Sequence, residues 1–154
     1  MPMPQVEIAE PKTAGEIDAV KALFIEYAQF LNVDLCFQGF DEEIATFPAA
    51  YRHLLLALVD GEAAGAVGFK DLGRGVCEMK RLYVRPGFQG LGLGRRLSLA
   101  LIDAARAQGF AIMRLDTLDR LKPAIALYNS LGFAESDSYY DNPLDGVIYM
   151  ALSL

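Results

Sequence analysis

The chain has 154 residues, of which 53% are hydrophobic and 22% are charged, and its 14 basic and 20 acidic residues give a formal net charge of −6. This length and composition predict a single globular domain over residues 1–154, with a core of its own and no disordered tract. The acidic balance argues against a nucleic-acid partner, because Arg95-Arg96 is the one dense basic pair.

The cysteines and the apolar runs point to a cytoplasmic protein. Cys36 and Cys77 are too few for a disulfide framework, so we expect two reduced thiols. The stretch at residues 1–5 has neither a basic nor an apolar region, so no signal peptide is expected. The longest apolar runs are too short to span a membrane, and no membrane partner is expected.

Hydrophobic periodicity and turn residues predict an α/β chain with a mixed sheet. In chain order, the expected elements are a strand at 6–9, a helix entered through the capping box Thr13 to Glu16 and reaching Leu31, a loop with a short helix at 34–47, strands at 54–59, 63–70 and 76–84, a helix at 93–107, a strand at 111–115, a helix at 123–131, and strands at 133–140 and 146–152. Consecutive hairpins followed by a βαβ crossover predict a mixed central sheet with helices on both faces.

Three glycines alternate in the segment Gln89-Gly90-Leu91-Gly92-Leu93-Gly94, between an expected strand and an expected helix. Glycines at a helix entry let backbone N–H groups close on an anion, and the helix dipole adds to the attraction. The turn therefore predicts a ligand that carries a diphosphate, with Arg95 and Arg96 as nearby cations. The Rossmann fingerprint and the Walker motif are both absent.

Two charged residues, Glu78 and Lys80, fall inside the expected strand at 76–84. Strict alternation would place them on the same face as Leu82 and Val84. Charges in such a strand are costly unless they reach solvent, a partner or a ligand. Two interpretations stay open: a solvated rim with a Glu78–Lys80 pair, or a base in an active-site cleft.

The remaining candidates have simpler interpretations. Tyr128, taken alone, is typical of an amphipathic helix with its hydroxyl satisfied at an edge. His53, the sole histidine, is expected at the surface, and with two distant cysteines it matches no metal-ligand spacing, so no metal is expected. Cys77 is expected to pack as a small hydrophobic residue.

The glycine turn resembles the Q/R-x-x-G-x-G/A motif of the GNAT N-acetyltransferases, in which the pyrophosphate of acetyl-CoA lies on such a turn. The pattern A-x-x-L-Y-x-x-L-G-F at residues 124–133 is similar to the late-helix motif of that family, and the order of elements, β-α-α-β-β-β-α-β-α-β-β, is also the GNAT order. The resemblance implies acetyl-CoA as co-substrate. Its implied binding residues are Leu82, Tyr83, Val84, Gln89, Gly90, Leu91, Gly92, Leu93, Gly94, Arg95, Arg96 and Asn129.

The same resemblance implies catalytic roles. Glu78 falls where some members carry a catalytic glutamate, and Tyr128 matches the tyrosine whose hydroxyl lies beside the CoA sulfur. A backbone N–H near Leu82 would stabilise the oxyanion. The acidic stretch at 34–43 would overhang the acceptor site, or be a solvated loop. Tyr139 and Tyr140 would line that pocket, or cover the sheet.

The implied function is transfer of an acetyl group from acetyl-CoA to a primary amine of a small molecule or peptide, by direct attack in a ternary complex. The alternative is a non-catalytic acyl-CoA-binding module that acts in regulation or partner binding. The acceptor stays open between an amino acid, a polyamine, an aminoglycoside and a protein N-terminus. The oligomeric state, including a homodimer, also stays open.

Overall fold

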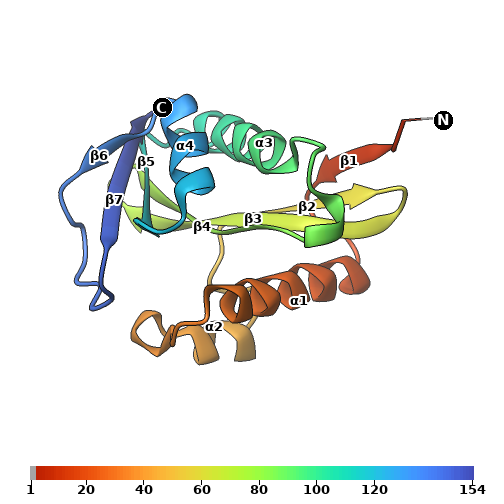
Figure 1. Cartoon of the computed structure of the whole chain (residues 1–154), viewed down its shortest axis with the longest axis horizontal. Coiled ribbons are helices and arrows are strands. Elements are labelled where there is room, and N and C mark those ends of the chain that lie inside the picture. The colour runs from red at the N-terminus through yellow and green to blue at the C-terminus, as the bar shows by residue number, and fades with distance from the viewer. Residues whose placement is uncertain (1–2) are drawn as a thin grey trace.

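The computed structural model describes residues 3–154, apart from the side chain of Phe37. Residues 1 and 2, at the start of the stretch without signal-peptide features, lie outside the described part. The elements are β1 (Val6–Ala9), α1 (Ala14–Leu31), α2 (Phe40–Ala45), β2 (His53–Val59), β3 (Glu62–Gly73), β4 (Val76–Val84), α3 (Leu93–Ala107), β5 (Ile112–Leu118), α4 (Lys122–Ser130), β6 (Ala134–Ser136) and β7 (Val147–Ser153), with 3-10 turns η1 (Cys36–Gln38) and η2 (Pro86–Phe88). Figure 1 shows them in the order expected from the sequence.

The seven strands form one sheet in the order β1-β2-β3-β4-β5-β7-β6. Neighbouring strands are antiparallel except β4 and β5, which are parallel because the chain crosses over through α3 between them. The helices α1 and α2 cover one face, and α3 and α4 cover the other (Figure 1). The expected mixed sheet with helices on both faces is confirmed.

A hydrophobic cluster holds each helical layer to the sheet. Leu97 and Leu101 of α3 are four residues apart, so both point to one face of the sheet, where they are fully buried. Val20 and Phe24 of α1 have the same spacing and are fully buried on the opposite face. Within residues 3–154, none of the helices is long and apolar enough to cross a membrane.

The capping box and the hairpin turn that the sequence predicts in the N-terminal half are both present. Thr13 Oγ1 accepts from the Glu16 N–H at 3.1 Å, and the Glu16 carboxylate accepts from the Thr13 N–H at 3.3 Å, which completes the capping box. Asp60 and Gly61 both have positive φ, 49° and 82°, as the two-residue turn of a hairpin requires.

The strand expected at 133–140 is confined to the three residues of β6. Side chains take over the backbone groups that a longer strand would pair. Arg114 donates to the Asp137 carbonyl at 2.7 Å, and the Tyr149 hydroxyl donates to the Tyr140 carbonyl at 2.8 Å. The chain can therefore leave the sheet without losing these hydrogen bonds.

A β-bulge interrupts β4 at Arg81. The two-residue step from Gly68 to Ala66 on β3 faces the three-residue step from Lys80 to Tyr83 on β4. Arg81 absorbs the extra residue with a φ of 64°. This left-handed conformation costs a non-glycine residue about 1–2 kcal/mol, so other interactions must hold it.

The bulge makes one sequence prediction wrong. Leu82 and Val84 were expected to share a face with Glu78 and Lys80, but they pack against the cluster under α3, together with Cys77. Glu78 and Lys80 alternate with the residues of that cluster and so face the α1 side of the sheet. Strict alternation fails because the bulge adds one residue between the two pairs.

Replacing Leu101 by alanine should destabilise the fold by roughly 2–5 kcal/mol, because it opens a cavity in a fully buried site. Leu99 lies on the same helix, is 42% exposed and provides the matched control, with an expected cost under about 1 kcal/mol for Leu99→Ala. Urea unfolding of both variants measures the difference. Equal costs would contradict the packing of α3 described above.

Candidate active site

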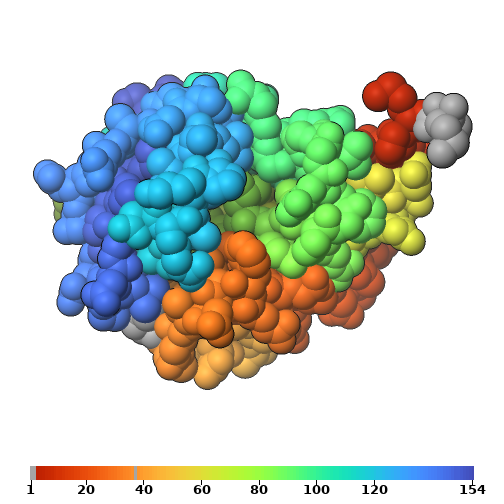
Figure 2. All heavy atoms as spheres, viewed as in Figure 1, coloured from red at the N-terminus to blue at the C-terminus, as the bar shows by residue number. Residues whose placement is uncertain are grey.

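A cleft opens where β4 and β5 separate. Their parallel pairing covers three residue pairs and ends at Glu78 with Arg114, although both strands continue. A cavity of about 40 Å³ lies between the diverging strands, and a second cavity of about 710 Å³ lies beside it. Figure 2 shows the surface hollowed where the end of α1 (orange), the segment after β4 (green) and the approach to α4 (cyan) meet.

The two cavities bring several predicted site residues together. Leu82 and Tyr128 line the small cavity, and Glu78 lines the large one. Gln38 and Lys80 line both, so the cavities adjoin at these two side chains. A reaction between a group in one cavity and a group in the other would take place here.

The glycine turn presents backbone N–H groups at the start of α3. Gly90 and Gly92 have positive φ, 87° and 69°, and no described atom lies within 4 Å of a Cβ placed on either. The first donor inside the helix is Arg96, whose N–H bonds to the Gly92 carbonyl at 3.0 Å. The N–H groups of residues 93–95 therefore precede the helix ladder, and Gly92 supplies no side-chain cap for them.

Side chains around the turn leave this backbone accessible. Leu93 is buried in a small cluster with Val59 and Ala64, and Leu91 packs partly buried against that cluster. Arg95 donates to Ser130 of α4 at 2.9 Å, and Arg96 is exposed. Both arginines thus lie next to the helix start, where an anion would gain from their charge.

An ion-pair network holds the bulge in β4. The Arg81 guanidinium donates to Glu43 of α2 at 3.2 Å and to Gln38 at 2.7 Å, and the Arg81 and Glu43 side chains are only 3% and 2% exposed. Lys70 and Tyr51 also donate to the Glu43 carboxylate, at 2.9 Å and 2.6 Å. Burial alone would raise the pKa of Glu43, but Arg81 and these hydrogen bonds hold the pKa below its usual value. The network ties α2 and η1 to the strained backbone of β4.

Glu78 lies in the large cavity between a cation and a phenol. Its carboxylate is 3.7 Å from the Lys80 ammonium and accepts from the Tyr139 hydroxyl at 2.5 Å. Burial lowers the pKa of Lys80, which the neighbouring Glu78 partly offsets. Burial and the Glu78 charge raise the pKa of Tyr139, so its hydroxyl stays protonated and donates.

Tyr128 is 8% exposed, and its ring packs edge-on against Phe133. Burial raises the pKa of Tyr128, and nearby Tyr27 and Asp116 add to the effect. Its hydroxyl is therefore protonated at neutral pH. Among the described residues, no side chain accepts a hydrogen bond from it, and the residue lines the small cavity.

Sequence reasoning missed a second polar group on β5. Asp116 accepts hydrogen bonds from the Tyr140 hydroxyl and from Asn142, the latter at 2.7 Å. Arg114, two residues earlier, lines the large cavity. The signal that marked Glu78, charged residues at alternate positions of a buried strand, was present here as well.

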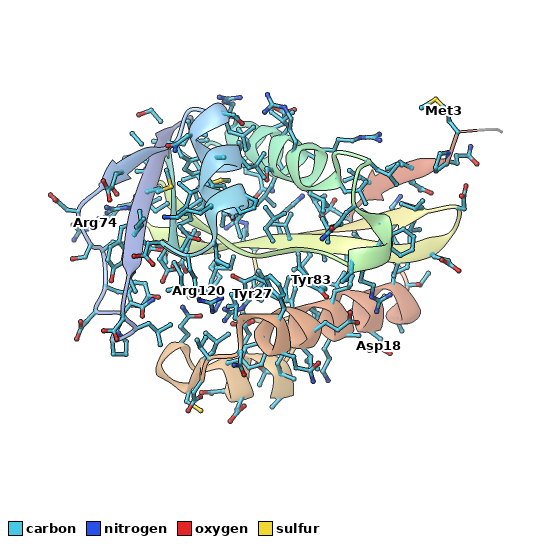
Figure 3. The ribbon with its side chains drawn as sticks, viewed as in Figure 1. Met3, Asp18, Tyr27, Arg74, Tyr83 and Arg120 are labelled. Atoms are coloured by element: carbon cyan, nitrogen blue, oxygen red, sulfur yellow. The ribbon has the colours of Figure 1, made fainter. Side chains whose placement is uncertain are left out.

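One long side chain joins the turn before α4 to the end of α1. Arg120, in the turn before α4, donates to the Leu31 carbonyl at the end of α1 at 2.5 Å. Figure 3 shows Arg120 beside Tyr27, below the sheet. Tyr27 lines the small cavity, and burial raises its pKa to about 12.

His53 and Cys77, for which the sequence predicts no catalytic or metal-binding role, contribute to packing. His53 was expected at the surface, but its side chain is 11% exposed and stacks on Phe69, because the ring lies between that strand neighbour and Gln108. Cys77 is fully buried, and burial raises its pKa to about 12, so it packs as a hydrophobic residue. Within residues 3–154, no group of three or more His, Cys, Asp or Glu side chains could hold a metal ion.

The acetyltransferase (GNAT) family model matches residues 18–133, about three quarters of the chain. The chain belongs to the GNAT family. It is 41% identical to an uncharacterised N-acetyltransferase of Schizosaccharomyces pombe over 97% of this chain and 95% of that protein. The homologues' names and the family together identify it as an acyltransferase.

Solved structures of acetyltransferases have the same fold. A GNAT acetyltransferase of Staphylococcus aureus aligns with a TM-score of 0.79 at 17% identity, over 97% of this chain and 99% of that one. A putative acetyltransferase of Salmonella typhimurium, solved with acetyl-CoA, aligns with a TM-score of 0.71 at 25% identity, over 96% and 93%.

Not all residues implied by the family resemblance have side chains in the cleft of this acyltransferase. Tyr83 packs under α1 beside Tyr27 and Phe30 and lines neither cavity. Val84 packs under α3. Gln89 and Asn129 are exposed near the turn and at the end of α4.

The acidic stretch of this acyltransferase divides in two. Glu43 is buried and paired with Arg81 and Lys70, so it is not available to a cationic amine. Asp41 and Glu42 are exposed on α2. Asp34 accepts from the Cys36 N–H at 2.9 Å within the loop.

Replacing Glu43 by glutamine should destabilise the acyltransferase by roughly 3–5 kcal/mol at pH 7, because Arg81 would stay buried without its anion. The folded pKa of Glu43 lies below its ordinary value of 4.5, so its contribution is present above that value and is lost as the pH falls through the folded pKa. The stability gap between wild type and Glu43→Gln should therefore shrink at about pH 3.

Urea unfolding at both pH values measures that gap, with Glu42→Gln as the control. Glu42 is its exposed neighbour on α2, so this change should cost no more than about 0.5 kcal/mol. A gap that is small at pH 7, or that does not narrow in acid, would contradict the role assigned to the ion pair.

Proposed function

We propose that the chain is a single-domain N-acetyltransferase that moves an acetyl group from acetyl-CoA to a primary amine of a small molecule or peptide. The amine attacks the thioester directly in a ternary complex. The observation that carries the proposal is the meeting of the two cavities at Lys80, with Tyr128 lining one cavity and Glu78 lining the other. Two free cysteines suit a reducing compartment, and we propose the cytoplasm.

The residues around the glycine turn fit the donor substrate. The open space above Gly90 and Gly92 would let a pyrophosphate approach the N–H groups of residues 92–95, and Arg95 and Arg96 would add charge. Past Glu78 and Arg114, no strand pairing joins β4 to β5 in the described residues, so their facing edges can bond the amides of the pantetheine arm. Gln89 and Asn129 would lie at the edge of this site.

Glu78 is the proposed base or ammonium-binding carboxylate. An alkyl amine with a pKa of about 10.4 is mostly protonated at neutral pH, and it must lose a proton before it attacks. Glu78 would receive that proton directly or through water. Tyr139 and Lys80 hold the carboxylate in place at the junction of the cavities.

The bulge supplies the proposed oxyanion donor. After Arg81 the backbone of β4 is displaced from the regular ladder, and Leu82 lines the small cavity. A backbone N–H fixed there would donate to the carbonyl oxygen as negative charge develops on it. Preorganised donors of this kind stabilise the transition state because they do not need to reorient during the reaction.

Tyr128 is the proposed donor to the departing thiolate. Its raised pKa keeps the hydroxyl protonated, and its hydroxyl is not committed to a described side chain. A CoA thiolate placed in the small cavity would accept this hydrogen bond. The acceptor amine would enter from the large cavity, on the other side of Lys80.

Replacing Gly92 by aspartate should weaken acetyl-CoA binding by roughly tenfold or more, because a carboxylate would stand where the phosphates approach. Aspartate tolerates positive φ and is a good helix N-cap, so the fold should persist. Gly92→Asn is the matched control, since it has the same shape without the charge. Calorimetric titration of both variants with acetyl-CoA decides, and equal affinities for Gly92→Asp and wild type would refute the site.

Replacing Tyr128 by phenylalanine should lower kcat by about 10²–10⁴-fold, the usual range for general acid catalysis. The ring keeps its packing against Phe133, so thermal stability should change little, and the KM for acetyl-CoA should move much less than kcat. Steady-state kinetics and thermal melts test this. A variant with full turnover, or one that loses only stability, would remove Tyr128 from the mechanism.

A further inference from the structure

The large cavity is positively charged although the chain is acidic. Its wall contains four cations, Lys70, Arg74, Lys80 and Arg114, against one carboxylate, Glu78. The whole chain has a formal net charge of −6. A concave surface of opposite sign to the rest of the molecule concentrates ligands that carry the complementary charge.

Two of these cations have a carboxylate of the protein beside them, although Glu43 is shared with Arg81. Lys80 lies 3.7 Å from the Glu78 carboxylate, and Lys70 lies 2.9 Å from Glu43. The two arginines have no carboxylate within ion-pair distance among the described residues. Arg74 and Arg114 are therefore the cations of this cavity without a carboxylate partner among the described residues.

Arg114 is held in place by neutral groups. Its Nη2 donates to the Ser136 hydroxyl at 3.3 Å and to the Asp137 carbonyl at 2.7 Å, and its guanidinium lies 4.7 Å from the centre of the Tyr139 ring. Its Nε is buried, and none of the described residues forms a hydrogen bond with it. These contacts orient the guanidinium, but none of them balances its charge.

The nearest carboxylate on the same strand, Asp116, does not form an ion pair with Arg114. Asp116 lines the small cavity and not the large one. Its carboxylate is occupied by hydrogen bonds from Tyr140 and Asn142. No described carboxylate therefore pairs with Arg114, which leaves its charge available to an anionic ligand in the large cavity.

Arg114 and Glu78 are neighbours in the sheet. They are register partners on parallel strands, so their side chains leave the same face about 4.8 Å apart. An α-amino acid carries an ammonium and a carboxylate on one carbon atom, and it can span this distance with each charge facing its opposite.

We propose that the acceptor is a free α-amino acid, with its carboxylate bound by Arg114 and its amino group facing Glu78. This inference rests on the proposed N-acetyltransferase function and narrows its acceptor. Molecules that carry only positive charge, such as polyamines and aminoglycosides, would be repelled by the two unbalanced arginines. Arg114 is then a specificity-determining residue of the reaction.

The rest of the cavity suits a small zwitterion. Arg74, in the turn between β3 and β4, is exposed at the end of the sheet remote from Met3 (Figure 3), where it can attract an anionic group toward the cavity. The volume of about 710 Å³ leaves room for an amino-acid side chain. Leu72 and Val76 give that side chain an apolar wall.

The test is CoA release from acetyl-CoA with matched acceptors: free L-amino acids, the amides of the same amino acids, putrescine and O-phosphoethanolamine. The wild type should prefer the best amino acid over its amide by roughly 10- to 100-fold in kcat/KM, the scale of a hydrogen bond to a charged group. In Arg114→Gln this ratio should approach one, mainly through the KM of the amino acid, while acetyl-CoA affinity is kept. Arg114→Lys should keep part of the preference.

Arg106→Gln is the control, because Arg106 is an exposed cation on α3 whose ion pair, with Asp103, lies outside both cavities. Its amino-acid preference should equal that of the wild type. If the wild type used amides or putrescine as well as amino acids, the inference would be overturned and the proposed function would stand. A preference for O-phosphoethanolamine would have the same consequence, as would an unchanged ratio of amino acid to amide in Arg114→Gln. Acetyl-CoA binding without CoA release in the presence of every amine would instead contradict the proposed function, and the inference with it. If Arg114→Gln does not fold, the acceptor ratios of the wild type alone still decide.

Discussion

Arg81 places a guanidinium in a space that is almost closed to water, and Glu43 meets it there from α2. A buried arginine needs an anion, and a non-glycine residue at positive φ needs an external restraint. The same ion pair satisfies both needs. It fixes the extra residue of β4, on the strand where Leu82 lines the small cavity, and it anchors α2 and the preceding turn, whose Gln38 lines both cavities. The positive φ of Arg81 and the displaced backbone before Leu82 thus depend on a side-chain contact from outside the strand.

The separation of β4 from β5 divides the chemistry between two environments. On the α3 side, the glycine turn offers backbone N–H groups and no buried carboxylate, which suits an anionic donor. On the α1 side, Glu78, Lys80 and Tyr139 form a polar group that can exchange protons with an acceptor. Lys80 stands at the boundary of the two cavities. In the proposed reaction, the fold would thus hold the charged nucleotide of acetyl-CoA apart from the reaction centre while keeping its acetyl end within reach of the acceptor.

Much of this arrangement could be predicted from the sequence, because it depends on local signals. The capping box at Thr13, the Asp60-Gly61 turn and the periodicity of α3 each specify their structure within a few residues. The bulge at Arg81 could not be predicted in this way. No glycine marks it, and its partner Glu43 lies 38 residues away on a helix that looks like part of an acidic loop. The predicted length of β6 was wrong for a similar reason. Side chains distant in the sequence form the hydrogen bonds to the backbone that follows this strand.

The proposed mechanism requires that the bulge present the Leu82 N–H to the carbonyl of the acetyl group. Amide NMR of ¹⁵N-labelled protein tests it directly, by titration with acetyl-CoA and, separately, with CoA, which lacks that carbonyl. Both ligands should shift the amides of residues 92–95, whereas the Leu82 amide should move downfield with acetyl-CoA and much less with CoA. Equal shifts at Leu82 with the two ligands, or none with either while the turn responds, would contradict the account.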